Sequence, residues 1–386
     1  FMAVAGIICE YNPFHLGHAR QLKLLREAMG EESLVVGVMS GNYVQRGMPA
    51  AWDKYARAAA AVAAGVDLVL ELPLTGVLSS AEGFARAGVE VLHRLGAVDT
   101  LCFGAECGEA AAFQALAELV DGEDYRQALR QGLDAGLSYA AAREKAAGSL
   151  SALLRKPNAI LGVEYCRAIR TLGASIKPLV IHRGGDYHAL APDAKEPSAT
   201  ALRAMLPGDG WKDFVPVPVA EILGTAVQYD VFYGQRALLA RLRGLNEAGW
   251  ASCAHGSEGL WRKAMAAVRE ADSFEALCAA VKSKRYPMTR IHRLLLCAYL
   301  GVTAVDLRRP IPYARILAFG HRGQALLRTL RKTSTLPLIN PGQQPADRDY
   351  FALEVRASDL FTLFAAPGAP TPAAMEQRAR IFLEKK

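Results

Sequence analysis

The sequence has no apolar run long enough to cross a bilayer. Charged residues interrupt every apolar segment, as Asp67 and Glu71 do within residues 66–73. Because a membrane-spanning helix needs about 20 predominantly apolar residues, no membrane association is expected. The first residues also lack the basic and then apolar pattern of a secretory signal. We therefore expect a cytoplasmic protein.

Paired cysteines are missing as well. The seven cysteines are an odd number, they are scattered, and no two have the spacing C-x-x-C, which fits reduced thiols better than a disulfide framework. The chain also has no internal repeat and no long low-complexity tract. Its 386 residues are 52% hydrophobic and 22% charged, which is enough for two or three domains that each bury a core. A packed enzyme is the expected class.

Strand and helix patterns alternate through the first half of the chain. The strand-like runs cover residues 4–9, 34–39, 68–72, 100–103 and 179–181. This alternation predicts an α/β fold with a Rossmann-like, mainly parallel sheet that binds ligands beyond the carboxyl ends of its strands. After residue 216 helical patterns such as 258–269 and 273–284 take over. We predict one domain over residues 2–212 and a mainly α-helical domain over residues 213–386, divided by the Pro- and Gly-rich segment 207–218.

The motif Asn-Pro-Phe-His-Leu-Gly-His, residues 12–18, lies where the first predicted strand runs into the first helix. A helix N-terminus offers N–H groups and a positive dipole end to phosphate oxygens, and Gly17 leaves room for a nucleotide ring. His15 and His18 are three residues apart and share one helix face. Both rings can therefore donate hydrogen bonds to the charge that develops when an α-phosphate is attacked. We predict that His15 and His18 are catalytic.

The alternative for this pair is two surface histidines or a zinc site. A short string of this kind is a weak signal by itself. Its position after the first strand strengthens the nucleotide interpretation, and no glutamate or third histidine lies nearby at zinc-ligand spacing. We therefore assign no metal ligands among the site residues, and the sequence does not tell whether protein side chains bind a metal.

The chain is similar to the HIGH-motif nucleotidyl transferases, and more closely to the bacterial tRNA(Met) cytidine acetate ligases. The blocks that carry the likeness, in the family's order, are residues 10–18, 39–47, 66–73, 103–108, 156–162 and 286–293. The resemblance implies a HUP-type nucleotidyl-transferase fold for the first domain. It also implies an enzyme that activates acetate with ATP to acetyl-adenylate, releases pyrophosphate, and acetylates the wobble cytidine of elongator tRNA(Met) to N4-acetylcytidine, with AMP as the second product.

The resemblance also implies which residues bind ATP. They are Ile8, Cys9, Glu10, Tyr11, Asn12, Pro13, Phe14, His15, Leu16, Gly17, His18, Ala19, Arg20, Gln21, Gly104, Asn158 and Arg183. Gly104 follows a predicted strand, where a side chain would obstruct a nucleotide, although a plain turn glycine is the alternative. Asn158 could instead be a helix N-cap. Arg183 ends a strand and presents a fork suited to phosphates, or it is a solvated arginine.

A second phosphate-binding signature of these transferases resembles residues 198–203. Ser198 and Thr200 form a hydroxyl-rich turn, and Arg203 would hold the departing pyrophosphate. The alternative is an ordinary capped helix start, because Ser198 or Thr200 would serve equally well as the N-cap.

The loop after the second predicted strand should open onto the same edge of the sheet. Asn42, Gln45 and Arg46 are therefore candidate substrate contacts, and exposed loop residues without a function are the alternative. The loop has Met48 after Gly47, where the family has an acidic residue, and Leu16 stands between the histidines where a polar residue is common. Neither departure removes a phosphate-binding group.

Basic residues beside an aromatic mark the C-terminal half. The formal net charge is +7, which favours binding of nucleic acid without specifying chemistry. We predict RNA contacts at Lys284, Arg285, Arg290 and Arg293, with a solvated helix face as the alternative. Tyr286 either stacks on a base or anchors its helix to the core.

We conclude from the sequence that the chain is an ATP-dependent acetate ligase acting on elongator tRNA(Met). Magnesium is expected to accompany the ATP, and no protein partner is implied. Two alternatives stay open: a nucleotidyl transferase that acts on a small phosphorylated metabolite without RNA, and a non-catalytic RNA-binding protein. The residues that bind acetate cannot be located from the sequence.

Overall fold

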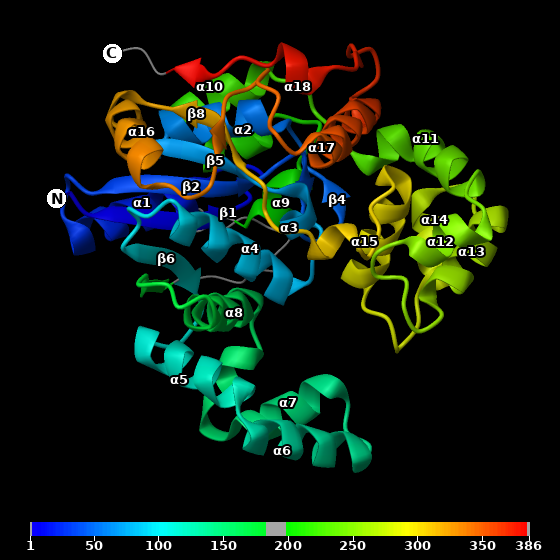
Figure 1. Cartoon of the computed structure of the whole chain (residues 1–386). Coiled ribbons are helices and arrows are strands. Elements are labelled where there is room, and N and C mark those ends of the chain that lie inside the picture. Colours follow the sequence, from blue (N-terminus) through cyan, green and yellow to red (C-terminus); the bar gives the residue numbers. More distant parts are fainter. Residues whose placement is uncertain (1, 183–197, 384–386) are drawn as a thin grey trace.

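A computed structural model describes residues 2–182 and 198–383 (Figure 1). Its core is a mostly parallel sheet. The parallel strands are β1 (Val4–Cys9), β2 (Leu34–Ser40), β5 (Leu68–Leu72), β6 (Thr100–Ala105) and β7 (Lys177–His182), in the order β5-β2-β1-β6-β7. All five predicted strands are confirmed. Four of them begin at the predicted residue, and β7 begins two residues before it. The strand order reverses beside β1, and this switch point is where open α/β sheets bind their ligands.

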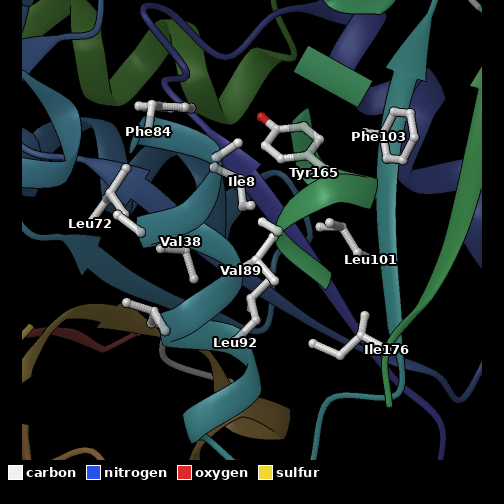
Figure 2. Packing of buried hydrophobic residues seen from close by; sticks show 14 of the residues in the cluster. Ile8, Val38, Leu72, Phe84, Val89, Leu92, Leu101, Phe103, Tyr165 and Ile176 are labelled. Carbon is white, nitrogen blue, oxygen red and sulfur yellow. The ribbon is translucent and has the colours of Figure 1, made fainter. Parts of the chain in front are cut away.

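Helices cover both faces of this sheet because its central strands are apolar on both sides. All six residues of β1 are buried. On one face lie α4 (Ala81–Arg94) and α8 (Pro157–Thr171), and on the other α1 (Leu16–Met29), α2 (Lys54–Ala63) and α10 (Val217–Thr225). Figure 2 shows Val89 and Leu92 of α4 beside Ile8 of β1. Successive residues of β1 thus pack on opposite faces of the sheet. Because both faces are packed, the end of β1 is held rigidly.

The chain returns to the sheet after residue 313. Strand β8 (Ala314–Phe319) pairs antiparallel with β5, and the short strands β9 (Leu338–Ile339) and β10 (Phe382–Leu383) pair parallel with β8. The sequence-based description of this half as helical missed these strands. A six-residue apolar run such as Ala-Arg-Ile-Leu-Ala-Phe cannot be told from a buried helix turn by its periodicity.

Beside the sheet stands a helical body. It consists of α11 (Val231–Arg243), α12 (Glu247–Ser252), α13 (Leu260–Glu270), α14 (Phe274–Val281) and α15 (Met288–Leu300), and α17 (Arg348–Phe361) packs against it. The predicted helical patterns at 258–269 and 273–284 are confirmed as α13 and α14. The division at residues 2–212 and 213–386 stays a prediction, since strands of the second part complete the sheet of the first.

Further helices and one small hairpin complete the described part of the chain. The remaining helices are α3 (Leu74–Val77), α5 (Ala110–Asp121), α6 (Glu123–Asp134), α7 (Tyr139–Ala147), α9 (Ala199–Arg203), α16 (His321–Thr333) and α18 (Met375–Arg378), and β3 (Tyr43–Val44) and β4 (Met48–Pro49) form a small hairpin. Across residues 2–182 and 198–383, no helix combines the length and apolarity that a membrane crossing requires.

Candidate active site

Two histidines close the first turn of α1. His15 is the N-cap, and its Nδ1 accepts the Gly17 N–H at 3.1 Å, while Nδ1 of His18 accepts the His15 N–H at 3.2 Å. The two rings stack with their centroids 3.7 Å apart. Because each Nδ1 is an acceptor, the proton of each neutral ring lies on Nε2. The predicted strand-to-helix position is confirmed, and the capping bonds fix both rings as Nε2–H donors.

Aromatic side chains hold the His18 ring from the core side. Tyr11 meets it edge-on at a centroid distance of 4.9 Å, and Phe14 lies 5.4 Å away. Both aromatic residues are buried, so they leave the ring little room to turn. A donor that is oriented in advance costs no reorganisation when charge develops.

The remaining residues of the stretch 8–21 divide between core and surface. Ile8 packs under α4 and Cys9 is buried, so these two can contact a nucleotide only through their backbone. Burial raises the pKa of the Cys9 thiol far above its usual value. Arg20 donates from Nη1 to the His182 carbonyl at 3.1 Å, which ties α1 to the end of β7.

The second signature reaches the first motif. Arg203 donates from Nη1 to the Asn12 carbonyl at 2.7 Å and from Nη2 to Thr200 Oγ1 at 3.3 Å. Ser198 is the N-cap of α9, and its hydroxyl accepts the Ala201 N–H at 3.1 Å. The capped helix start is therefore correct for Ser198, and α9 lies beside the histidine turn. That Arg203 holds pyrophosphate stays a prediction.

Gly104 and Asn158 lie across the switch point from β1. Gly104 is near the end of β6, which pairs with β1. Asn158 donates from Nδ2 to Glu106 Oε1 at 2.8 Å, and Glu106 Oε2 accepts the Ala159 N–H at 3.2 Å. Lys156 is the N-cap of α8, so the N-cap alternative for Asn158 is wrong. Arg183 lies outside the described residues.

Glu106 is a residue that the sequence did not single out. Its carboxylate accepts an N–H in the first turn of α8, where the helix dipole favours negative charge. The same carboxylate holds the Asn158 amide, so it fixes the orientation of a predicted ATP contact. Its position directly after β6, at the carboxyl end of a strand, is the feature of the sequence that could have identified it.

The loop after β2 is largely buried and is hydrogen-bonded to other parts of the protein. Asn42 is buried, accepts the Lys54 N–H at 2.9 Å through Oδ1, and donates to Ser358 Oγ at 3.3 Å. The backbone N–H of Gln45 donates to Glu10 Oε1 at 2.7 Å, and Arg46 is partly exposed. The alternative that Asn42 is an exposed loop residue is therefore wrong. Substrate contact by this loop stays a prediction.

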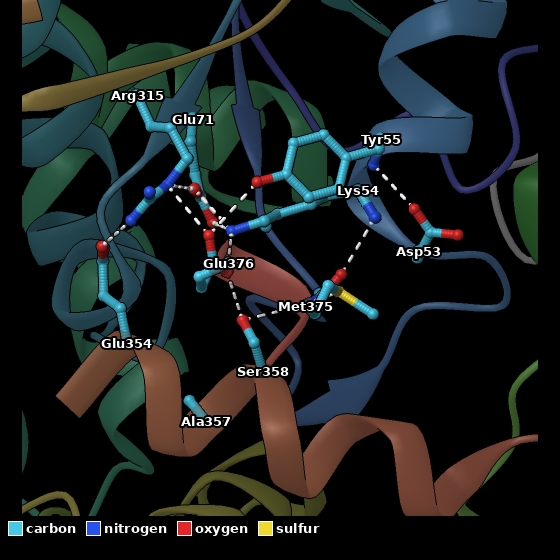
Figure 3. A network of polar contacts seen from close by, with 12 residues as sticks. Asp53, Lys54, Tyr55, Glu71, Arg315, Glu354, Ala357, Ser358, Met375 and Glu376 are labelled. Carbon is cyan, nitrogen blue, oxygen red and sulfur yellow. Dashed lines mark hydrogen bonds and ion pairs between the residues drawn. The ribbon is translucent and has the colours of Figure 1, made fainter. Parts of the chain in front are cut away.

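Behind this loop lies a buried charged cluster, defined as Lys54, Glu71, Arg315, Glu354 and Glu376 (Figure 3). Lys54 Nζ lies 2.7 Å from Glu71 and 2.5 Å from Glu376. Arg315 donates from Nε to Glu71 at 3.0 Å and from Nη2 to Glu354 at 2.8 Å. The cluster therefore joins α2, β5, β8, α17 and α18 in one network.

The basic segment 284–293 is largely committed to internal contacts. Arg290 pairs with Glu258 at 3.0 Å, and Arg285 lies 3.7 Å from the same carboxylate. Tyr286 is buried and donates to the Glu258 carbonyl at 2.6 Å, so it anchors the segment rather than presenting a face to a base. Lys284 is exposed.

The RNA contact at Arg293 stays a prediction, and the structure gives this residue internal contacts. Its side chain is buried and donates from Nη1 to the Gln45 carbonyl at 3.3 Å. Gly47 also packs so closely on this helix that an added Cβ would lie 2.4 Å from the Arg293 backbone nitrogen. A run of charges in a sequence does not reveal which members face inward.

The comparisons with known proteins agree with this geometry. The family model for the HIGH nucleotidyl transferases matches residues 2–376. This chain belongs to that family. It is 35% identical to the tRNA(Met) cytidine acetate ligase of Acetivibrio thermocellus, over 94% of this chain and 95% of the relative. With the enzyme of the same name from Syntrophotalea carbinolica it shares 37% identity, over 88% of this chain and 84% of the relative.

Solved structures show the same fold. The apo structure of Thermotoga maritima TmcAL superimposes with a TM-score of 0.89 at 29% identity, covering 99% of this chain and 100% of that one. A second structure of the Thermotoga protein, bound with alpha-thio ATP, has a TM-score of 0.87 at 30% identity, with the same coverage. The predicted α/β nucleotidyl-transferase fold is thereby confirmed.

Proposed function

We propose that this chain is an ATP-dependent ligase that activates acetate as acetyl-adenylate and then acetylates the wobble cytidine of elongator tRNA(Met). The observation that carries the proposal is the stacked pair His15 and His18, which caps α1 at the switch point of the sheet. The names of the relatives supply the substrate class. Because tRNA is found in the cytoplasm, the proposal places the enzyme there.

In the first half-reaction an acetate oxygen attacks the α-phosphorus of ATP. A phosphorus–oxygen bond forms, the bond to the leaving pyrophosphate breaks, and negative charge grows on the phosphate oxygens. The Nε2–H groups of His15 and His18 supply donors for this charge, while the N–H groups of His15 and Gly17 stay bonded to the histidine rings. Arg203, held at the Asn12 carbonyl, brings a cation to the same turn.

In the second half-reaction the exocyclic amine of the cytidine attacks the carbonyl carbon of acetyl-adenylate. The new carbon–nitrogen bond replaces the bond to AMP, and the amine loses one proton. We assign the tRNA to the helical body and its neighbours, where Lys284 presents an exposed charge and lysine pairs readily with phosphate as a point charge.

Magnesium would accompany the triphosphate and offset its charge. Among the described residues, no three His, Cys, Asp or Glu side chains gather as a metal site. Magnesium is commonly held mainly by phosphate oxygens and water, so the proposal requires no such group of protein ligands.

The test is exchange of labelled pyrophosphate into ATP by the purified protein. We expect exchange that requires acetate, is weaker with formate or propionate, and is lost in His18→Ala. Incubation with acetate, ATP and elongator tRNA(Met) should yield N4-acetylcytidine, detected by mass spectrometry of the digested tRNA. Exchange that proceeds without acetate, or unchanged activity of His18→Ala, contradicts the proposal. Activity with a small phosphorylated metabolite and no tRNA would instead support the other transferase class.

A further inference from the structure

Arg57 lies on the inward face of α2, in an alanine-rich helix whose sequence gives it no motif. Its side chain is fully buried, with 0% exposure. The guanidinium donates from Nε to the Trp52 carbonyl at 3.0 Å and from Nη2 to the Ser40 carbonyl at 3.0 Å. It also donates from Nη1 to the Glu10 carbonyl and from Nη2 to the Gly41 carbonyl. One side chain therefore binds four backbone carbonyls.

Three of these carbonyls lie at the edge of the sheet that holds the candidate active site. Glu10 directly follows β1, Ser40 ends the neighbouring strand β2, and Gly41 directly follows it. Arg57 thus ties together the carboxyl ends of two adjacent parallel strands, one residue before the turn at Tyr11. The planar fork of an arginine is needed to reach all of them, because a lysine has one nitrogen.

Two neighbouring hydrogen bonds do not use these carbonyls. Around it, Asn12 accepts the Ala51 N–H at 2.8 Å and Glu10 accepts the Gln45 N–H at 2.7 Å, and both bonds use side chains instead of the carbonyls. Without Arg57, the buried carbonyls at the strand ends would lose their donor, and a buried acceptor without a donor is costly. The turn would then relax toward other hydrogen-bond partners.

The positive charge of Arg57 lies next to the turn that is predicted to bind the nucleotide. In the described part of the chain its hydrogen bonds go only to backbone carbonyls. Burial lowers the pKa of Arg57 to about 10, so the group stays charged at neutral pH. A buried cation is tolerated when dipoles hold it. Here it stands behind the turn that would receive a triphosphate.

We propose that Arg57 is a positioning residue for ATP: by binding the carbonyls of Glu10, Ser40 and Gly41, it holds the strand ends so that the His15–His18 turn keeps its nucleotide-binding shape. The inference rests on the proposed use of ATP and extends it to a residue that itself touches no substrate.

The experiment measures ATP binding by calorimetry and acetate-dependent pyrophosphate exchange in the full chain, for Arg57→Lys and Arg57→Ala. We expect the Kd and the KM for ATP to rise about tenfold or more in both, since several charge-assisted hydrogen bonds are lost. Added guanidinium ion, below unfolding concentrations, should restore ATP binding to Arg57→Ala, whereas methylammonium should not, because only guanidinium restores the planar fork.

Arg243 provides the matched control. It likewise donates to backbone carbonyls, at 3.2 Å from Nε to Val268 and at 2.7 Å from Nη2 to Ala271, but it lies in the helical body. Arg243→Lys and Arg243→Ala should lower the Tm and leave the Kd for ATP unchanged. This separates positioning of the nucleotide from general stability.

An unchanged Kd for ATP in a folded Arg57→Lys protein overturns the inference, as does an equal rise in the Arg243 variants. If Arg57→Ala does not fold, Arg57→Lys decides the question through its Kd and its Tm together. If the natural chain binds ATP but shows no acetate-dependent exchange, the proposed ligase activity fails while the positioning role is still decided by the Kd. A natural chain that does not bind ATP contradicts both.

Discussion

At the scale of single residues, His15 and His18 each have two tasks. Their Nδ1 atoms accept backbone N–H groups in the first turn of α1, at 3.1 and 3.2 Å. The same bonds decide which nitrogen carries the proton. Substitution by alanine therefore removes a helix cap together with a donor, and the two losses need to be separated.

We predict that His15→Asn separates them. Asparagine is a good N-cap, so the Tm should stay close to that of the natural chain, whereas His15→Ala should lose about 1 kcal/mol of stability. Both variants lack the Nε2–H donor and should lose about 100-fold in the rate of pyrophosphate exchange. Thermal unfolding and exchange kinetics check the two effects. Equal exchange rates in His15→Asn and the natural chain would assign His15 to capping alone.

Residue positions were predictable where a local pattern determines them, and not where tertiary contacts do. The motif at residues 12–18 identified a strand-to-helix turn from its spacing alone. The environment of Arg293 could not be found this way, because its burial depends on the approach of Gly47 from a hairpin far away in the sequence. Arg57 was hidden for the same reason, since its partners lie on β1 and β2.

At the scale of elements, close backbone contacts set how helices sit on the sheet. Helix α16 approaches the start of β5 at Gly323, where an added Cβ would lie 1.8 Å from the Asp67 carbonyl oxygen. Asp67 in turn accepts the Val35 N–H at 2.8 Å through its side chain. The backbone at this edge cannot retreat without breaking the register of β2 and β5.

We predict that Gly323→Ala destabilises the protein by about 3 kcal/mol through overpacking. Gly244→Ala is the control, because an added Cβ there meets nothing closer than 3.5 Å, and its effect should be small. Urea unfolding followed by circular dichroism measures both. A Gly323→Ala protein as stable as the control would show that α16 can shift away from β5.

The elements themselves were predicted unevenly. The bounds of β1 and β5 are the same as those of the predicted runs 4–9 and 68–72. Strands that are buried on both faces of a sheet have a nearly continuous apolar run, which is easy to recognise in a sequence. Strand β8 was missed, since its pairing partner β5 lies about 245 residues earlier and nothing local marks the pairing. The N-cap alternative for Asn158 was wrong because Lys156 is the cap of α8, and helix boundaries are the least certain part of a prediction from sequence.

At the scale of the whole molecule, the buried charged cluster connects the first and last parts of the chain. Burial alone would raise the pKa of Glu376, but Lys54 and Arg315 outweigh it and hold this pKa at about 2. A depressed carboxyl pKa stabilises the folded state above the pKa of the unfolded chain, and this contribution is lost as the pH falls through the folded value. The relevant window runs from about pH 4.5 down to about pH 2.

We predict that Glu376→Gln lowers the free energy of unfolding at pH 7 by an amount on the order of 3 kcal/mol and flattens its decline below pH 4.5. The control is Glu123→Gln, which breaks an exposed pair with Arg126 at 3.2 Å and should change little. Urea unfolding at several pH values gives both curves. Parallel curves for Glu376→Gln and the natural chain would contradict the assigned role of Glu376.

A second prediction at this scale concerns the proposed division of the chain. Residues 2–212 alone lack Arg315, Glu354 and Glu376, so Lys54 and Glu71 would lose most of their buried partners. The edge of β5 would also lose β8. We expect this fragment to aggregate or to unfold without cooperativity, as circular dichroism and gel filtration would show. A cooperative thermal transition would establish residues 2–212 as an independent domain.

The contact between Lys54 and Glu376 spans 322 positions in the sequence, and this separation has a consequence for protein synthesis. A ribosome releases the strands around the candidate active site early and the glutamate that completes their charged cluster much later. Until then, Lys54 has Glu71 as a partner but lacks Glu376, so burial of its charge is only partly compensated. The nascent chain would therefore complete its buried charged cluster only when synthesis is nearly finished.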